Sequence, residues 1–188
     1  PPLAVQYTDY AHWQRQQPPT ALAEDLAFWK TTLADAPVLT LPTDHPRPAI
    51  RSAAGATHTL TLNPDTIHHL TTHAHTHDAT LFMALTAATT IWLSRHTGQT
   101  DITLGTATSG RTHTELEPLI GFFVNTLPLR THTTETHTYT QHLTHIRTTT
   151  LNAYTHDTTP FERIVDTATP HRDPSRNPLT EAMIVLDN

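Results

Sequence analysis

One segment constrains the fold of this chain more than any other: a long helix that ends before Gly98. Asp78 or Thr80 can open it, because both side chains accept hydrogen bonds from free helical N–H groups. Its apolar residues cover most of the circumference: Leu81, Phe82, Ala84, Leu85, Ala88, Ile91, Trp92 and Leu93. We therefore expect this helix to be buried on nearly all sides.

Caps and apolar spacing predict five further helices, which begin near residues 7, 21, 64, 139 and 161. Thr8 or Asp9 is expected to cap the first helix. Thr20 and Asn63 are expected to cap the second and the third. The helix from residue 139 is expected to bury Leu143, Ile146 and Leu151.

Strands are predicted between these helices, over residues 57–62, 101–107, 120–130 and 183–186. Strands that alternate with helices indicate an α/β fold. Four prolines between positions 36 and 48 predict an extended connector. We treat the chain as one unit, 1–188, with linking helices and connector over residues 1–50 and an α/β core over residues 51–188.

The strand over residues 120–130 holds one polar side chain that needs an explanation. Asn125 interrupts a run of apolar and β-branched residues. A buried amide without hydrogen-bond partners destabilises a fold by about 1–3 kcal/mol. Either Asn125 is a satisfied core residue that pins a neighbouring loop, or it faces a cleft.

Charge and composition exclude several classes of protein. The formal net charge is −6 and the 11 Lys and Arg residues form no cluster, so we expect no nucleic-acid partner. The absence of Cys excludes disulfides and thiolate ligands. With neither a signal peptide nor a membrane-length apolar run, we expect no membrane partner and a cytoplasmic location.

Histidine is frequent, with 16 residues, many of them in Thr-His pairs. His69 and His73 lie four residues apart on a predicted helix, a spacing that suits zinc ligands. The same pairs recur at His132, His137, His142 and His145. Because the histidines of this amphipathic helix fall largely on its polar side, we expect solvated rings and no metal ion.

Two polar segments near the C-terminal end carry candidate residues. In the turn over residues 156–162, Asp157 is expected to cap the helix that follows. The loop over residues 172–178 is open to two interpretations. It is either a salt-bridged support for a strand end, or a place from which Arg176 or Asn177 orients a catalytic group.

Seven motifs follow one another in the order of a single family. They are Tyr7-x-Asp9-Tyr10-Ala11-x-Trp13-Gln14; Phe28-Trp29 with Leu41-Pro42-Thr43-Asp44-x-Pro46-Arg47-Pro48; Thr80-Leu81-Phe82-Met83; Gly105-Thr106-x-x-x-Gly110-Arg111; Ile120-Gly121-x-Phe123-Val124-Asn125-Thr126; His156-x-x-x-Pro160-Phe161-Glu162; and Arg172-Asp173-x-Ser175-Arg176-Asn177-Pro178-Leu179. No Ser-His-Asp triad, phosphate loop or dinucleotide fingerprint competes with them. Over essentially its whole length the chain closely resembles the condensation domain of nonribosomal peptide synthetases.

The resemblance implies a chloramphenicol-acetyltransferase-like fold, in which two lobes enclose a tunnel, with a mixed sheet and flanking helices in this lobe. It also implies a reaction that joins a donor aminoacyl or peptidyl thioester to the amine of an acceptor aminoacyl thioester. Carrier domains would deliver both on phosphopantetheine arms, so the chain is expected to bind no cofactor by itself. The implied partners are the first lobe, the donor and acceptor carrier domains and an adenylation domain.

The resemblance also places candidate residues on the tunnel wall: Ser109, Gly110, Arg111, Asn125, Arg176 and Asn177. The first three would form a floor loop, and the last two would reach into the tunnel, where donors stabilise a developing oxyanion. Asn125 is expected to hold the floor, with partners in that loop or across the tunnel. Structural roles are expected for Tyr10, Trp13, Gly121, His156, Asp157, Pro160, Phe161, Glu162, Arg172 and Asp173.

The chain departs from the family pattern in one respect. The active-site motif His-His-x-x-x-Asp-Gly belongs to the family's first lobe, and here His68-His69 is followed by His73 and Ala74 where Asp and Gly are required. We therefore expect most of a second lobe, without a catalytic residue and inactive alone. The alternative is a naturally truncated lobe that serves as a docking platform for an adenylation, carrier or tailoring partner.

Overall fold

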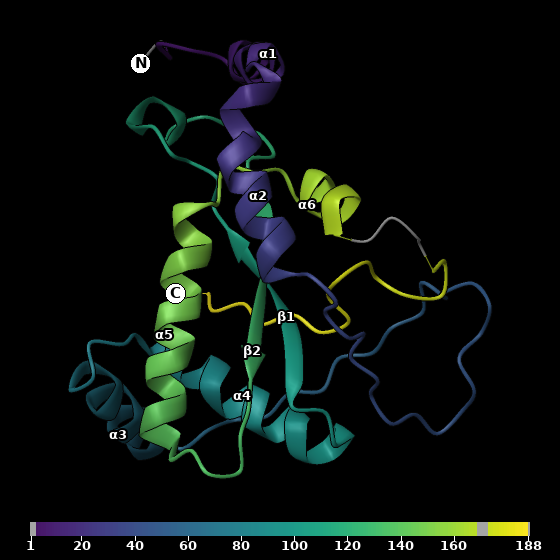
Figure 1. Ribbon diagram of the computed structural model, residues 1–188. Helices are drawn as coiled ribbons and strands as arrows, with labels where there is room; N and C mark the ends of the chain where they lie inside the picture. The colour runs from purple at the N-terminus through teal and green to yellow at the C-terminus, as the bar shows by residue number, and fades with distance from the viewer. Residues whose placement is uncertain (1–2, 169–172, 188) are drawn as a thin grey trace.

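The computed structural model describes residues 3–168 and 173–187 of the 188-residue chain. Its helices and strands are α1 (Tyr7–Gln16), α2 (Ala23–Thr32), α3 (Pro64–His75), α4 (Leu81–Thr97), β1 (Asp101–Thr108), β2 (Asn125–His132), α5 (Tyr139–Thr155) and α6 (Phe161–Ala168). Two 3-10 turns, η1 (Pro19–Leu22) and η2 (Thr114–Leu116), precede α2 and β2. Figure 1 shows β1 and β2 through the middle of the molecule, with α5 along them and α4 across one end.

The mixed sheet that was predicted is a two-stranded antiparallel sheet in the structure. β1 and β2 pair antiparallel along all eight residues of each strand. On the other edge of β1 the chain returns in the parallel direction: the Gly105 N–H donates to the Ala182 carbonyl at 2.8 Å, and the Gly105 carbonyl accepts from Ile184 at 2.9 Å. The strand predicted over residues 183–186 is reduced to a single bridge at Met183.

The strand predicted over residues 57–62 is not formed. These residues are exposed, Leu60 to 76% and Leu62 to 48%, and no strand precedes β1 in the described part of the chain. Alternation alone was misleading, because a strand must also pair its N–H and C=O groups with a neighbour.

The strand predicted over residues 120–130 is correct only in its second half. β2 begins at Asn125, and of the five residues before it only Phe123 is buried. Ile120 is 96% exposed and Phe122 78%. The first half is therefore a loop whose apolar side chains divide between a small core and the solvent.

Two predicted caps were wrong. Gln6, and neither Thr8 nor Asp9, precedes α1, and its N–H donates to the Asp9 carboxylate at 2.9 Å. Thr20 lies inside η1, so α2 begins only at Ala23. By contrast, the caps predicted at positions 63 and 80 are present, and each side chain accepts a helical N–H.

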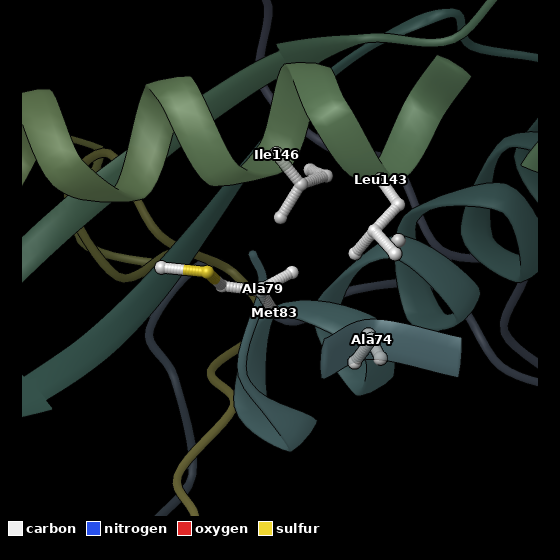
Figure 2. Close-up of a cluster of buried hydrophobic side chains, with 7 residues drawn as sticks. Ala74, Ala79, Met83, Leu143 and Ile146 are labelled. Carbon is white, nitrogen blue, oxygen red and sulfur yellow. The ribbon is translucent and has the colours of Figure 1, made fainter. Parts of the chain in front are cut away.

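The main core lies between α3, α4 and α5. Leu143 and Ile146 of α5 point down onto Ala74, Ala79 and Met83 (Figure 2). A second cluster packs α2 against β2, α5 and α6, around Trp29, Leu33, Leu127, Leu129, Ala153 and Ile164. No helix within the described residues is long and apolar enough to cross a membrane.

Three burial predictions need correction. α4 has an exposed face, on which Trp92 is 55% accessible. Leu151 is 41% exposed, and the neighbouring Thr150 is buried in its place. His142 is not solvated but buried against Thr90, at 2.8 Å from its hydroxyl, and burial lowers the pKa of His142 to about 4.

Candidate functional site

The predicted floor residues Ser109, Gly110 and Arg111 begin a longer segment, residues 109–124, which we call the floor loop. It leaves β1 through a glycine. Gly110 has φ +62°, in the left-handed region that side chains disfavour. A Cβ atom there would also collide with the Phe123 carbonyl. The loop therefore closes on itself directly after Ser109, whose hydroxyl accepts the Arg111 N–H at 3.4 Å.

Arg111 ties the loop together from inside. Its guanidinium donates to the carbonyls of Leu116 and Glu117, and to that of Leu119 at 2.9 Å. The same group lies 4.3 Å from the centre of the Phe123 ring, a cation–π contact. Because its donors are directed at loop carbonyls, Arg111 fixes the shape of the floor.

Helix α1 and the loop share a small separate core. Leu116, Leu119 and Phe123 are buried there against Tyr10. The Tyr7 hydroxyl donates to the Phe122 carbonyl at 3.1 Å, and the Tyr7 ring meets Phe123 edge-on at 5.2 Å. A side chain at Gly121 would collide with the Tyr7 ring, which explains the glycine in this motif. Tyr10 and Gly121 both lie at this contact between α1 and the loop.

The outer side of the same loop is apolar and uncovered. Ile120, Phe122 and Val124 are 96%, 78% and 49% exposed, at alternate positions. Trp13 of α1 is 47% exposed and meets the His113 ring edge-on at 5.8 Å. We call Ile120, Phe122 and Val124 the outer row. Ordered apolar side chains gathered in this way on a surface are typical of an interaction site.

Asn125 is a satisfied residue that fastens the start of β2. Its amide group donates to the carbonyls of Asp157 and Thr159 at 2.9 and 2.8 Å. Its oxygen accepts the N–H groups of Thr126 and Phe161 at 3.0 and 3.1 Å. The partners were expected in the floor loop or across the tunnel, and that was wrong: they lie in the turn before α6. These four hydrogen bonds fit the interpretation in which Asn125 is satisfied and holds a neighbouring segment.

The start of α6 is consequently held by Asn125, where the sequence suggested Asp157. The Pro160 carbonyl accepts the N–H of Arg163 at 2.9 Å, and Glu162 lies exposed in the first turn. Burial, with a smaller contribution from Asp25, raises the pKa of Asp157. The turn therefore depends on an amide 36 residues earlier in the chain, which no local pattern reveals.

His156 anchors this turn to α2. Its Nδ1 lies 2.6 Å from an oxygen of Asp25, and its ring stacks on Phe28 at 3.9 Å. The Trp29 indole donates to the His156 carbonyl at 3.2 Å, and Thr158 donates to Asp25 at 3.0 Å. The sequence marked His156, Phe28 and Trp29 as motif residues but missed Asp25, which shows no local signal.

The segment over residues 173–178, yellow in Figure 1, lies apart from the floor loop and holds Arg176 and Asn177. Asn177 accepts from Arg51 at 2.6 Å, and Arg176 lies 3.5 Å from Asp173 and 3.9 Å from Glu181. Together with the segment that follows α2, from Leu33 to Val38, they line a cavity of about 570 Å3 that also includes charged side chains.

Asp173 itself accepts the Ser175 N–H and hydroxyl, and these bonds lower its pKa. The predicted partner Arg172 lies outside the described residues. The described part of this segment thus makes the salt-bridged contacts of the first interpretation.

The histidines of α3 do not converge. His68 and His69 are exposed, and His73 lies against His77, with ring centres 4.7 Å apart. Within residues 3–168 and 173–187, no group of three or more His, Cys, Asp or Glu side chains is placed to hold a metal ion.

Comparison with known proteins identifies the family. The condensation-domain model matches residues 1–188. The chain is 45% identical over 188 residues to a linear gramicidin synthase of Brevibacillus parabrevis, covering 99% of this chain and 4% of that protein. The X-domain from teicoplanin biosynthesis matches with a TM-score of 0.88 and 28% identity, over 97% of this chain and 42% of that one.

The first condensation domain of the CDA synthetase has the same fold. Its TM-score is 0.78 at 19% identity, over 98% of this chain and 40% of that one. The chain therefore spans about two-fifths of these solved chains and a small part of the synthetase. The predicted α/β fold, one lobe of the chloramphenicol-acetyltransferase-like type, is confirmed. With a match that runs along all its residues, this chain belongs to the condensation-domain family of nonribosomal peptide synthetases.

Proposed function

We propose that the chain is the second lobe of a condensation domain that joins carrier-bound aminoacyl and peptidyl thioesters. In this proposal residues 109–124 form the floor of the tunnel between the lobes. The observation that carries it is the outer row, which is exposed although the loop that bears it is fixed from inside. In this proposal the partner that covers this row is the first lobe of a condensation domain; the chain spans about two-fifths of the solved chains that it matches.

A fixed loop favours association with another lobe. Binding usually carries an entropic cost for ordering loops and side chains. Arg111 and Gly110 already hold the backbone in one shape, so most of that cost falls on folding of the lobe and not on docking. Burial of Phe122, which is 78% exposed, then contributes through the apolar area removed from water.

The proposed reaction needs two lobes. The amine of the acceptor attacks the thioester carbonyl of the donor; a C–N bond forms, the C–S bond breaks, and the thiol leaves. A base must hold or accept the amine proton, and the family supplies it from the His-His-x-x-x-Asp-Gly motif that this chain lacks. This lobe would contribute shape, with the floor at Ser109, Gly110 and Arg111 and Asn125 behind it.

Partners follow from the same proposal. Donor and acceptor carrier domains would bring the phosphopantetheine thioesters as substrates, and an adenylation domain would stand next in the synthetase. Arg176 and Asn177 line a separate charged cavity, so they would support the connector beside the tunnel wall. The site of action would be the cytoplasm.

The test is reconstitution in trans. The chain is incubated with loaded donor and acceptor carrier proteins, with and without a separately produced first lobe, and dipeptidyl carrier is measured by mass spectrometry. We expect product only when the first lobe is present. Phe122→Asp should reduce the yield of dipeptidyl carrier at least tenfold, because it weakens lobe association. The control is Val38→Asp, outside the outer row at a position about as exposed as Val124, and it should leave the yield unchanged. Product from the chain alone, or full product with Phe122→Asp, would contradict the proposal.

A further inference from the structure

A second cavity, of about 410 Å3, opens where four elements meet. The first turn of α4 supplies Leu81 and Phe82, the end of β1 supplies Thr106 and Ala107, α5 supplies Tyr154, and the last described segment supplies Val185. Its volume lies in the range of small-ligand sites, roughly 300–1,000 Å3.

The chemistry of the lining is distinct. No charged side chain is among the described residues that line it: the walls are aliphatic and aromatic, with the hydroxyls of threonine and tyrosine as polar groups. By contrast, Asp35, Asp173, Arg176 and Glu181 line the larger cavity. A charged group placed against an uncharged, largely apolar wall loses hydration without gaining a partner. The smaller cavity therefore favours an uncharged, apolar group over an acidic or basic one.

Its position connects it with the proposed tunnel. Thr106 and Ala107 lie in β1, and Ser109, the first residue of the floor loop, follows two residues later. We propose that this cavity receives the uncharged, apolar side chain of an aminoacyl thioester lying along the floor. The inference rests on the proposed function and adds to it a substrate class and the residues that select it.

The test is a binding titration that needs no first lobe. Leucyl and aspartyl pantetheine amides, in which nitrogen replaces the thioester sulfur, are added to the 15N-labelled chain. We expect the leucyl analogue to shift the amide signals of Thr106, Ala107 and Tyr154 in a saturable way, and the aspartyl analogue to bind at least tenfold more weakly. Equal binding of the two analogues, or shifts confined to other parts of the chain, would overturn the assignment.

Two substitutions locate the binding. Val185→Asp puts a charge on the wall at a side chain that is 53% exposed, and should weaken leucyl binding at least tenfold. Val38→Asp, 54% exposed and outside this cavity, is the matched control and should leave it unchanged. Should Val185→Asp melt early, Ala107→Phe, which fills the cavity, replaces it with the same expected loss. Unchanged binding in either folded variant rejects the assignment.

The two proposals fail separately. If the reconstituted lobes make dipeptide but the leucyl analogue does not bind here, the cavity assignment falls and the proposed function stands. If the leucyl analogue binds here but the reconstituted lobes make no dipeptide, the proposed function falls, and with it the aminoacyl thioester as the occupant.

Discussion

Two irregular segments of this protein, residues 51–62 and residues 109–124, led to similar expectations from sequence but differ in structure. Both were expected to form strands in part, and neither does. Every residue from 51 to 62 is exposed, and Arg51 donates hydrogen bonds to Pro174 and Asn177. The other segment buries Leu116, Leu119 and Phe123 in a core of its own.

The two segments differ in whether their own residues can close the backbone into a loop and satisfy its hydrogen bonds. Residues 109–124 contain a glycine at a left-handed turn and an arginine with several donors, and these close the loop without a neighbouring strand. In residues 51–62 the alternation is confined to residues 57–62, where threonine alternates with histidine and leucine, and such a pattern needs a partner strand. Residues 109–124 therefore hold their shape through their own hydrogen bonds, whereas residues 51–62 have no partner strand in the described part of the chain.

The two segments should differ most in their response to substitution of a glycine. Gly110→Ala meets the Phe123 carbonyl and keeps an unfavourable φ, so we expect the loop to lose its packing, at roughly 3–4 kcal/mol. Gly55→Ala has open space around it and should change stability by less than about 0.5 kcal/mol. Urea unfolding and amide exchange of residues 111–124 measure both effects. Equal effects of the two substitutions would remove the distinction between the segments.

Asn125→Leu should have the next largest effect. It leaves the carbonyls of Asp157 and Thr159 and the Phe161 N–H without their partner, and an unsatisfied buried group costs about 1–3 kcal/mol. We expect a loss near 2–3 kcal/mol, with faster amide exchange at the start of α6 than in the floor loop. Asn152→Leu, at an exposed position of α5, is the control. Faster exchange in the floor loop than in α6 would restore the original expectation for Asn125.

Partners that are close in the sequence could be predicted, and distant ones could not. Asn63 and Thr80 were identified as caps because their partners lie two or three residues away. Asn125 was identified as a polar residue that needs partners, but those lie 32 to 36 residues away in a turn that sequence alone does not position. The same holds for Asp25, whose partner His156 is 131 residues distant.

Burial was predicted less well than element type. The run from residue 120 to 124 has the composition of a core strand, yet its outer row points to solvent. Apolar composition indicates that a surface will be covered, but not whether the cover belongs to the same lobe. His142 shows the reverse error, because a residue type frequent on the surface of this chain occupies a core position on α5.

Lowering the pH should destabilise the main core, in which His142 is buried, more than the floor loop. The folded-state pKa of His142, about 4, lies below its ordinary value of 6.5, so its neutral form is the one compatible with the fold. The unfolded chain gains a proton as the pH falls below 6.5, so stability is full above that value and declines toward pH 4, by about 2 kcal/mol at pH 5. His142→Asn should flatten this dependence, and His58→Asn, at an exposed position of residues 51–62, should not. Chemical unfolding at pH 5 and pH 7 measures the change in the free energy of unfolding. An unaltered pH dependence in His142→Asn would contradict the role assigned to His142.

Arg111→Lys is a smaller change, and it tests the hydrogen bonds by which Arg111 holds the floor loop. Lysine places one ammonium where arginine directs a planar fork at several carbonyls, so about 1–2 kcal/mol should be lost locally. The change should appear as faster amide exchange between residues 116 and 123, with the α4–α5 core unaffected. Arg95→Lys, at an exposed position near the end of α4, is the matched control. Unchanged exchange in Arg111→Lys would mean that packing against α1 alone holds the floor.

The smallest effect is expected in residues 51–62. Leu60→Ser and Leu62→Ser remove apolar side chains that are already 76% and 48% exposed, so each should change the free energy of unfolding by less than about 0.5 kcal/mol. Thermal unfolding of the chain measures this, with Leu104→Ser, at a 1% exposed position of β1, as the destabilised reference. A loss above about 1 kcal/mol at Leu60 would mean that the segment pairs as a strand in solution. Residues 51–62 would then be stabilised by a neighbouring strand, whereas residues 109–124 are stabilised by their own residues. An alternating segment becomes stable once a neighbour accepts its backbone hydrogen bonds.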